Sequence, residues 1–140
     1  MTSLPNQAGD SKGLTEAICS FVVETRSEDI PRAALESATL LILDTIGITL
    51  AASALPIGKI ITQYVAEANG PTLATVLGGG LKAAPSMAAL ANGTMANALD
   101  FDGGWHTTTH VVPSALAVVE HKQLSGRDLL DAFVIGVEVG

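Results

Sequence analysis

Apolar residues recur at helical spacing along most of this chain, and the pattern predicts about six helices. The first is expected over residues 15–24, where the apolar positions share one side. They are Leu14, Ile18, Phe21 and Val22. The second is expected over 31–52, because Pro31 suits a first helical turn. Further helices are expected over 56–69, 85–99, 113–121 and from residue 127 onward, the last with a capping box from Ser125 to Asp128.

The second predicted helix is the most apolar of the six, and its late half is apolar nearly all round. The residues expected to face the core are Leu35, Leu41, Ile42, Ile46 and Leu50. The run 38–55 is almost long enough to span a bilayer. Asp44 lies near its middle, where a charge costs about 2.5–3.5 kcal/mol on insertion scales. We therefore interpret it as a core helix and expect no membrane association.

Outside the helices, residues 72–77 are short and β-prone and lead into a turn at 78–80. The predicted fold is mainly α, an orthogonal array of about six helices with at most a minor short strand. Residues 1–13 are expected to form a disordered tail, and residues 14–140 part of a helical domain. The last helix is still apolar where the sequence stops, at Gly140, so we expect a longer parent design.

Charge is scarce in this sequence: 15% of the residues are charged and 48% are hydrophobic. A soluble domain usually has about a quarter charged residues. We therefore expect surface to be buried against a partner, in a homo-oligomer such as a dimer or with a completing subunit. The net charge of −7 argues against nucleic-acid binding. No secretory signal is recognisable, so we expect a cytoplasmic protein, and the single cysteine, Cys19, is expected to be a buried small hydrophobe.

The candidate chemistry gathers after the fourth predicted helix, in a stretch expected to be a loop from Asp100 to Val112. Four acid and imidazole side chains lie there within eleven positions: Asp100, Asp102, His106 and His110. Loops on a rigid scaffold carry much of protein function. One carboxylate could act as a base or orient an imidazole. Alternatively, both acids make turn and cap hydrogen bonds.

The two histidines of this stretch admit three interpretations. They could act in acid–base chemistry or substrate binding, they could be structural, or they could chelate a metal with an acid. Gly103 and Gly104 disfavour a regular helix here, and no Glu follows His106 as in the zinc-protease motif. Thr109 and its two neighbours offer hydroxyls to a carboxylate, and Trp105 is expected to anchor the loop by packing.

At these residues the chain resembles the MmgE/PrpD family, which includes 2-methylcitrate dehydratase, cis-aconitate decarboxylase and iminodisuccinate epimerase. The resemblance extends over residues 30–140. It rests on the segments LLILDTIG (40–47), ATVLGGG (74–80), AALANGTMANALDFD (88–102), WHTTTH (105–110) and SGRDLLDAFVIGVEV (125–139).

The resemblance implies a helical domain with a lid domain encoded by later sequence, and an active site between the two. It implies lyase chemistry, dehydration or decarboxylation, on a small di- or tricarboxylate such as 2-methylcitrate or cis-aconitate. Asp100 and His110 match the family's site residues and are the expected catalytic pair. His106, Thr109 and Asp102 would be substrate contacts. Neither a metal nor an organic cofactor is implied.

The chain departs from the family pattern in ways that bear on activity. Gly103 and Gly104 replace an Asp and a Thr, Asn97 replaces a His, and the segment after His110 is shorter. The family's site lysines, a further histidine and its lid would lie past Gly140. The alternative function is a truncated, catalytically silent helical module that pairs with itself or with a fuller homologue. A third, a small metal-binding helical protein, rests on the spacing of the two histidines.

Overall fold

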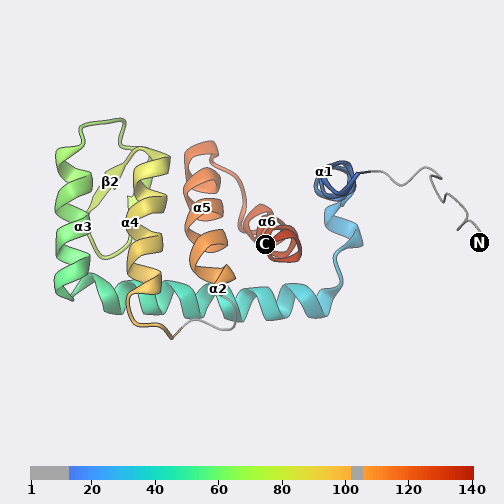
Figure 1. The fold of residues 1–140 in the computed structure, drawn as a ribbon, viewed down its shortest axis with the longest axis horizontal. Coiled ribbons are helices and arrows are strands. Elements are labelled where there is room, and N and C mark those ends of the chain that lie inside the picture. Colours follow the sequence, from blue (N-terminus) through green and yellow to red (C-terminus); the bar gives the residue numbers. More distant parts are fainter. Residues whose placement is uncertain (1–12, 102–105) are drawn as a thin grey trace, which may run out of the picture.

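The computed structural model describes residues 13–101 and 106–140, and over them the fold is mainly α, as predicted (Figure 1). The expected tail, residues 1–13, lies almost entirely outside the described residues. The elements are α1 (Leu14–Glu24), a short 3-10 turn (Ser27–Asp29), α2 (Arg32–Ser53), α3 (Pro56–Glu67), β1 (Ala74–Val76), β2 (Leu81–Ala83), α4 (Pro85–Asn97), α5 (Thr107–Lys122) and α6 (Gly126–Val139).

Helix α2 contacts four other helices, α3, α4, α5 and α6. Figure 1 shows α3, α4 and α5 side by side across it, and α6 also contacts it. Its buried residues are Ala38, Ile42, Thr45, Ile48, Thr49 and Ala52. The hydroxyls of Thr45 and Thr49 donate to the carbonyls one turn back, at 2.8 and 2.7 Å, so these polar groups are satisfied in the core.

The prediction that Leu50 faces the core is wrong, because 47% of its surface is exposed. The late half of α2 is apolar nearly all round, so periodicity could not tell which side the other helices would cover. A small residue lies on the covered side instead: Ala52 is fully buried, which lets α2 approach its neighbours closely. Leu40 and Leu43 are also left exposed on the uncovered side.

By length and composition alone, α2 could also cross a membrane. It is the one such helix among the described residues, and 28% of its most apolar window is buried. Core helices of soluble proteins pass the same test. Our interpretation of α2 as a core helix therefore stays a prediction.

Strands β1 and β2 form an antiparallel hairpin in which Ala74 pairs with Ala83. The second strand was not predicted from the sequence. Asn92 of α4, almost fully buried, holds β1 from one side. Its amide nitrogen donates to the Thr75 carbonyl, and its amide oxygen accepts from the Leu77 N–H, both at 2.9 Å. The hairpin is thereby attached to the helix that leads to the candidate site.

Glu120 of α5 also holds the hairpin, through both of its strands. Its carboxylate accepts hydrogen bonds from the Thr75 N–H, the Thr75 hydroxyl and the Lys82 ammonium, each at 2.6 Å. Partial burial acts to raise the pKa of Glu120. The hydrogen bonds from Lys82 and Thr75, with the Lys82 charge, outweigh that effect and hold the pKa below its usual value. The contact therefore stabilises the folded state at pH values above the ordinary pKa of a carboxyl group. This stabilisation is lost as the pH falls and Glu120 becomes protonated.

Helix α6 begins at the predicted capping box. The Ser125 hydroxyl accepts from the Asp128 N–H at 3.2 Å, and the Asp128 carboxylate accepts from the Ser125 N–H at 2.8 Å. Hydrogen bonds from Ser125 lower the pKa of Asp128. Further along, Phe133 packs with Ala38, Ile42 and Val112 in a core cluster between α2, α5 and α6.

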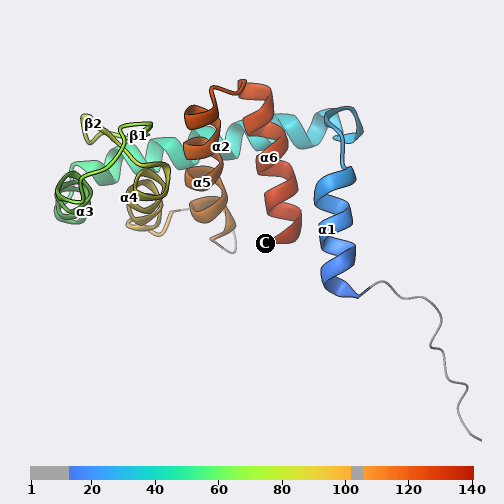
Figure 2. The ribbon, with the colours of Figure 1, turned by 90° about the horizontal axis from the view of Figure 1, so that it is seen from above.

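Helix α1 lies at the end of the molecule, beside α6 (Figure 2). None of its residues is buried, and its apolar stripe is exposed. The prediction that Cys19 is buried is wrong, since Cys19 is exposed. The stripe was recognised correctly, but a stripe does not show whether another part of the described chain covers it.

Candidate functional site

The site begins where α4 ends. After Asn97 the backbone turns, and Asp100 adopts a left-handed conformation with φ of 54°. Its N–H donates to the Asn97 carbonyl at 3.3 Å, which closes the turn. Gly, Asn and Asp are the residue types that adopt this left-handed conformation most readily at a single position. Asp102 and Trp105 lie outside the described residues, so the predictions for them stay predictions.

The predicted loop from Asp100 to Val112 is wrong in its second half, because α5 begins at Thr107 rather than at Pro113. Pro113 lies inside the helix and has no N–H to give to the Thr109 carbonyl. Gly93 of α4 lies beside this carbonyl, and a Cβ there would be 3.3 Å from the oxygen. The two helices are thus closely packed where α5 lacks a backbone hydrogen bond, and that arrangement is not visible in local sequence.

His106 is the N-cap of α5 and is also left-handed, with φ of 59°. Its carbonyl accepts three contacts from the first turn of α5. The Thr109 N–H lies at 3.2 Å, the Thr109 hydroxyl at 2.7 Å and the His110 Nδ1 at 2.7 Å. The structure therefore brings His106, Thr109 and His110 together.

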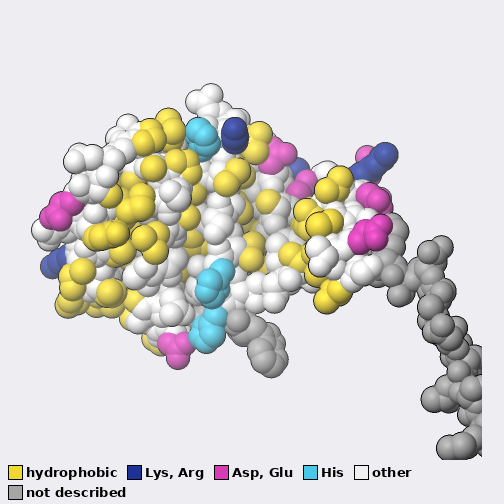
Figure 3. Space-filling model, turned by 45° about the horizontal axis from the view of Figure 1, so that its top comes forward, with side chains coloured by type: hydrophobic (Ala, Val, Ile, Leu, Met, Phe, Trp, Pro, Cys, Tyr) yellow, Lys and Arg dark blue, Asp and Glu magenta, His cyan; other side chains and the backbone are white. Residues whose placement is uncertain are grey.

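Asp100 does not contact His110 through any hydrogen bond or ion pair within the described residues. Its Oδ1 lies 3.8 Å from Nε2 of His106, and both side chains are mostly exposed, at 82% and 54%. An exposed pair of this kind contributes little to stability. Figure 3 shows two neighbouring histidine side chains at the lower edge of the molecule, with an acidic side chain close by. The role expected for Asp100, as a base or as the group that orients His110, stays a prediction.

A groove of about 520 Å³ runs between α4 and α5. His110 and Thr109 line it, so two of the predicted residues share one hollow. Its other lining residues are Ser86, Ala89, Leu90, Gly93, Thr94, Asn97, Pro113 and Ser114. The hydroxyls of Ser86, Thr94 and Ser114 and the amide of Asn97 were not predicted as parts of the site. Helical spacing from His110 to Ser114 would have indicated the latter, had α5 been recognised from Thr107.

The side chains that line the groove limit which ligands it can bind without further polypeptide. Of the described residues that line it, none is Lys or Arg. A polycarboxylate needs cations or many hydrogen-bond donors to offset the loss of its hydration. Within residues 13–101 and 106–140, no three His, Cys, Asp or Glu residues lie together as metal ligands. The hydroxyls of Thr94, Thr109 and Ser114 already donate to backbone carbonyls. The groove thus offers an acidic ligand one imidazole, the Ser86 hydroxyl and the Asn97 amide.

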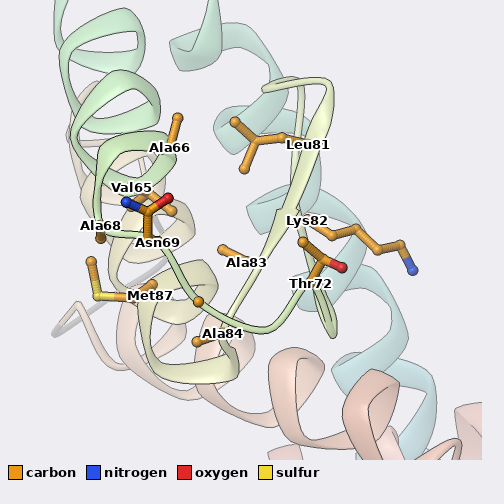
Figure 4. Close-up of a pocket in the computed structure, with 11 residues that line it drawn as sticks. Val65, Ala66, Ala68, Asn69, Thr72, Leu81, Lys82, Ala83, Ala84 and Met87 are labelled. Carbon is orange, nitrogen blue, oxygen red and sulfur yellow. The ribbon is translucent and has the colours of Figure 1, made fainter.

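A second hollow, of about 270 Å³, lies between α3, the hairpin and the start of α4 (Figure 4). Val65, Ala83 and Met87 make it largely apolar. Lys82 lines its edge, but Figure 4 shows its ammonium directed away, and this group binds Glu120 at 2.6 Å. None of the predicted site residues lines this hollow, whereas Thr109 and His110 line the α4–α5 groove, so that groove is the candidate site.

Residues 16–140 match the model of the MmgE/PrpD N-terminal domain. Over its whole length the chain is similar to the cis-aconitate decarboxylase of Aspergillus terreus, with 29% identity over 150 aligned positions. It is also 29% identical, over 137 positions and 91% of the chain, to the cis-aconitate decarboxylases of Mus musculus and Homo sapiens. The chain spans only 28% to 31% of the length of these relatives. No solved structure matches it.

Proposed function

Because this chain belongs to the MmgE/PrpD family, we propose that the groove between α4 and α5 is one wall of a lyase site for a small di- or tricarboxylate. The observation that carries the proposal is His110, an imidazole that lines this groove with one ring nitrogen bound to the protein. The names of the relatives favour cis-aconitate as the ligand to test. The resemblance also admits 2-methylcitrate.

Within this proposal His110 transfers the proton. In a dehydration it would accept the proton from the carbon beside a carboxylate, and hydroxide would leave from the next carbon. In a decarboxylation the bond to carbon dioxide breaks, and the imidazolium would return a proton to the carbon that keeps the electron pair. His106 and Asp102 would contact a substrate carboxylate, as would Thr109 once its hydroxyl turned away from the His106 carbonyl, while Asp100 would act as a base or an orienting group.

We propose that further polypeptide completes the site; the lack of Lys and Arg among the described lining residues supports this. Since the chain spans less than a third of the relatives' length, such residues have a place in the family's remaining sequence. We therefore expect the chain alone to bind a polycarboxylate weakly and to turn it over poorly or not at all.

The test is a nuclear magnetic resonance titration of the ¹⁵N-labelled chain with cis-aconitate, with product followed in the same sample. We expect amide shifts in the second half of α4 and the first turn of α5, and an affinity at least about fivefold lower in His110→Ala. His121→Ala is the matched control, because His121 is exposed at the other end of α5 and should leave the affinity unchanged. Shifts elsewhere, or an unchanged affinity in His110→Ala, would refute the proposal.

A second candidate function, self-association, is favoured by the uncovered side of α2. We define the α2 outer stripe as Leu40, Leu43, Asp44, Gly47, Leu50 and Ala51, all exposed. Leu40 and Leu43 are 68% and 64% exposed, and Asp44 is the one charged residue of the stripe. We propose a second copy of this chain as the partner, since like-charge repulsion across such a contact would be limited to Asp44.

Light scattering after size-exclusion chromatography tests this second proposal. We expect a dimer that dissociates in the double variant Leu40→Lys, Leu43→Lys, with unchanged helix content, because charged side chains cannot be buried in the contact. Ile60→Lys is the matched control, because Ile60 is equally exposed but lies on α3. A monomeric parent chain, or a dimer that the double variant does not affect, would exclude the stripe as a self-association surface.

A further inference from the structure

The contact between His110 and the His106 carbonyl determines which ring nitrogen of His110 carries hydrogen. Nδ1 lies 2.7 Å from the carbonyl oxygen. A carbonyl oxygen has lone pairs and no hydrogen, so it can only accept. At this distance a bare Nδ1 would place two lone pairs against each other. In the neutral ring Nδ1 is therefore the protonated nitrogen, and Nε2 has the lone pair.

We propose that His106 is a positioning residue whose backbone carbonyl fixes the tautomer of His110 and leaves the lone pair on Nε2 as the proton acceptor of this groove residue. This inference rests on the proposed function for its consequence in catalysis. It differs from the role expected from sequence, in which the His106 imidazole contacts the substrate. Here the backbone of His106 does the positioning, and the imidazole is dispensable for it.

The left-handed backbone of His106 explains why its carbonyl is available. An N-cap residue is normally extended, and its side chain caps the helix. His106 instead has φ of 59° and ψ of 9°, and its side chain makes no cap hydrogen bond. Its carbonyl accepts from the side chains of Thr109 and His110 in addition to the Thr109 N–H. The conformation thus directs one oxygen at both side chains.

The Thr109 hydroxyl supports the same arrangement. It lies 2.7 Å from the His106 oxygen and 3.3 Å from Nδ1 of His110. The shorter contact is the hydrogen bond to the carbonyl, so the hydroxyl hydrogen is used there. Thr109 therefore does not supply a proton to Nδ1, and the ring has to donate its own.

Substitutions at position 106 can distinguish the effect of the backbone conformation from the effect of the imidazole side chain. Glycine and asparagine remove the imidazole but tolerate the left-handed conformation. Valine removes it too, and its branched side chain disfavours that conformation strongly. If the backbone is what matters, His106→Gly and His106→Asn keep the tautomer of His110, whereas His106→Val loses it. If the imidazole matters, all three variants change alike.

The measurement is ¹⁵N nuclear magnetic resonance of the histidine rings, above the pH at which they titrate, with His110→Ala used to assign the signals. We expect the Nδ1–H tautomer in the parent chain, in His106→Gly and in His106→Asn. We expect a shift toward the Nε2–H form, which free imidazole side chains prefer in water, in His106→Val. Circular dichroism checks folding, and His106→Ala replaces the valine variant if that one unfolds.

An Nε2–H tautomer in the parent chain would overturn the inference, as would equal shifts in the glycine and valine variants. The experiment contains no substrate, so it can fail independently of the proposed function. Loss of cis-aconitate binding with an intact tautomer would refute the proposed function alone.

Discussion

Replacement of Asn92 by alanine is expected to lower the free energy of unfolding by about 3 kcal/mol. Asn92 is 2% exposed and is bound to two backbone groups of the hairpin. Alanine would leave the Leu77 N–H and the Thr75 carbonyl without these partners. Each unsatisfied buried polar group costs about 1–3 kcal/mol, and the missing side chain also leaves a small cavity. Urea denaturation followed by circular dichroism measures the change.

Asn97→Ala is the matched control for this substitution. Asn97 is on the same helix, but it is exposed and lines the groove. Its replacement is expected to change the free energy of unfolding by no more than about 0.5 kcal/mol. Equal losses in the two variants would mean that the hairpin does not depend on the Asn92 amide.

Gly58→Ala is expected to destabilise the protein by about 3 kcal/mol or more. Helix propensity alone predicts the opposite sign, since alanine is favoured over glycine by about 1 kcal/mol inside a helix. Gly58 lies in the first turn of α3, against the end of α2. A Cβ there would lie 2.6 Å from Cα of Ser53 and still closer to the carbonyl oxygen of Ala52. These are backbone atoms, so the two helices would have to separate.

Thermal unfolding of Gly58→Ala beside Gly126→Ala tests this prediction. Gly126 begins α6, and a Cβ there meets nothing within 4 Å. Alanine at that position should leave the melting temperature unchanged or raise it slightly. A melting temperature for Gly58→Ala equal to that of the parent chain would show that α2 and α3 can move apart without cost.

The beginnings of most helices could be predicted because their signals are local. Prolines at 56 and 85 and the capping box at Ser125 act within one turn, and the structure places helix starts at each. The start of α5 could not be predicted in this way. It depends on a left-handed His106 and on a Pro113 that is tolerated beside Gly93 of another helix. Strand β2 was missed because its pairing partner lies across a turn.

The candidate site was predicted in part. Sequence singled out His106, Thr109 and His110, and these three lie together. It did not indicate Thr94, because the register between α4 and α5 is set by packing rather than by spacing along the chain. Nor did it indicate that a backbone carbonyl, rather than a carboxylate, would hold the imidazole.

The contacts of four helices with α2 determine how the protein unfolds. Helices α3, α4, α5 and α6 all contact α2, and the hairpin connects α3, α4 and α5 in addition. None of these elements can therefore unfold without exposing the core of the others, and together they form one cooperative unit. Helix α1 has no buried residue and can fray while that unit stays intact. Local opening of the chain thus begins at its N-terminal helix, at the end of α2 far from the groove (Figure 1).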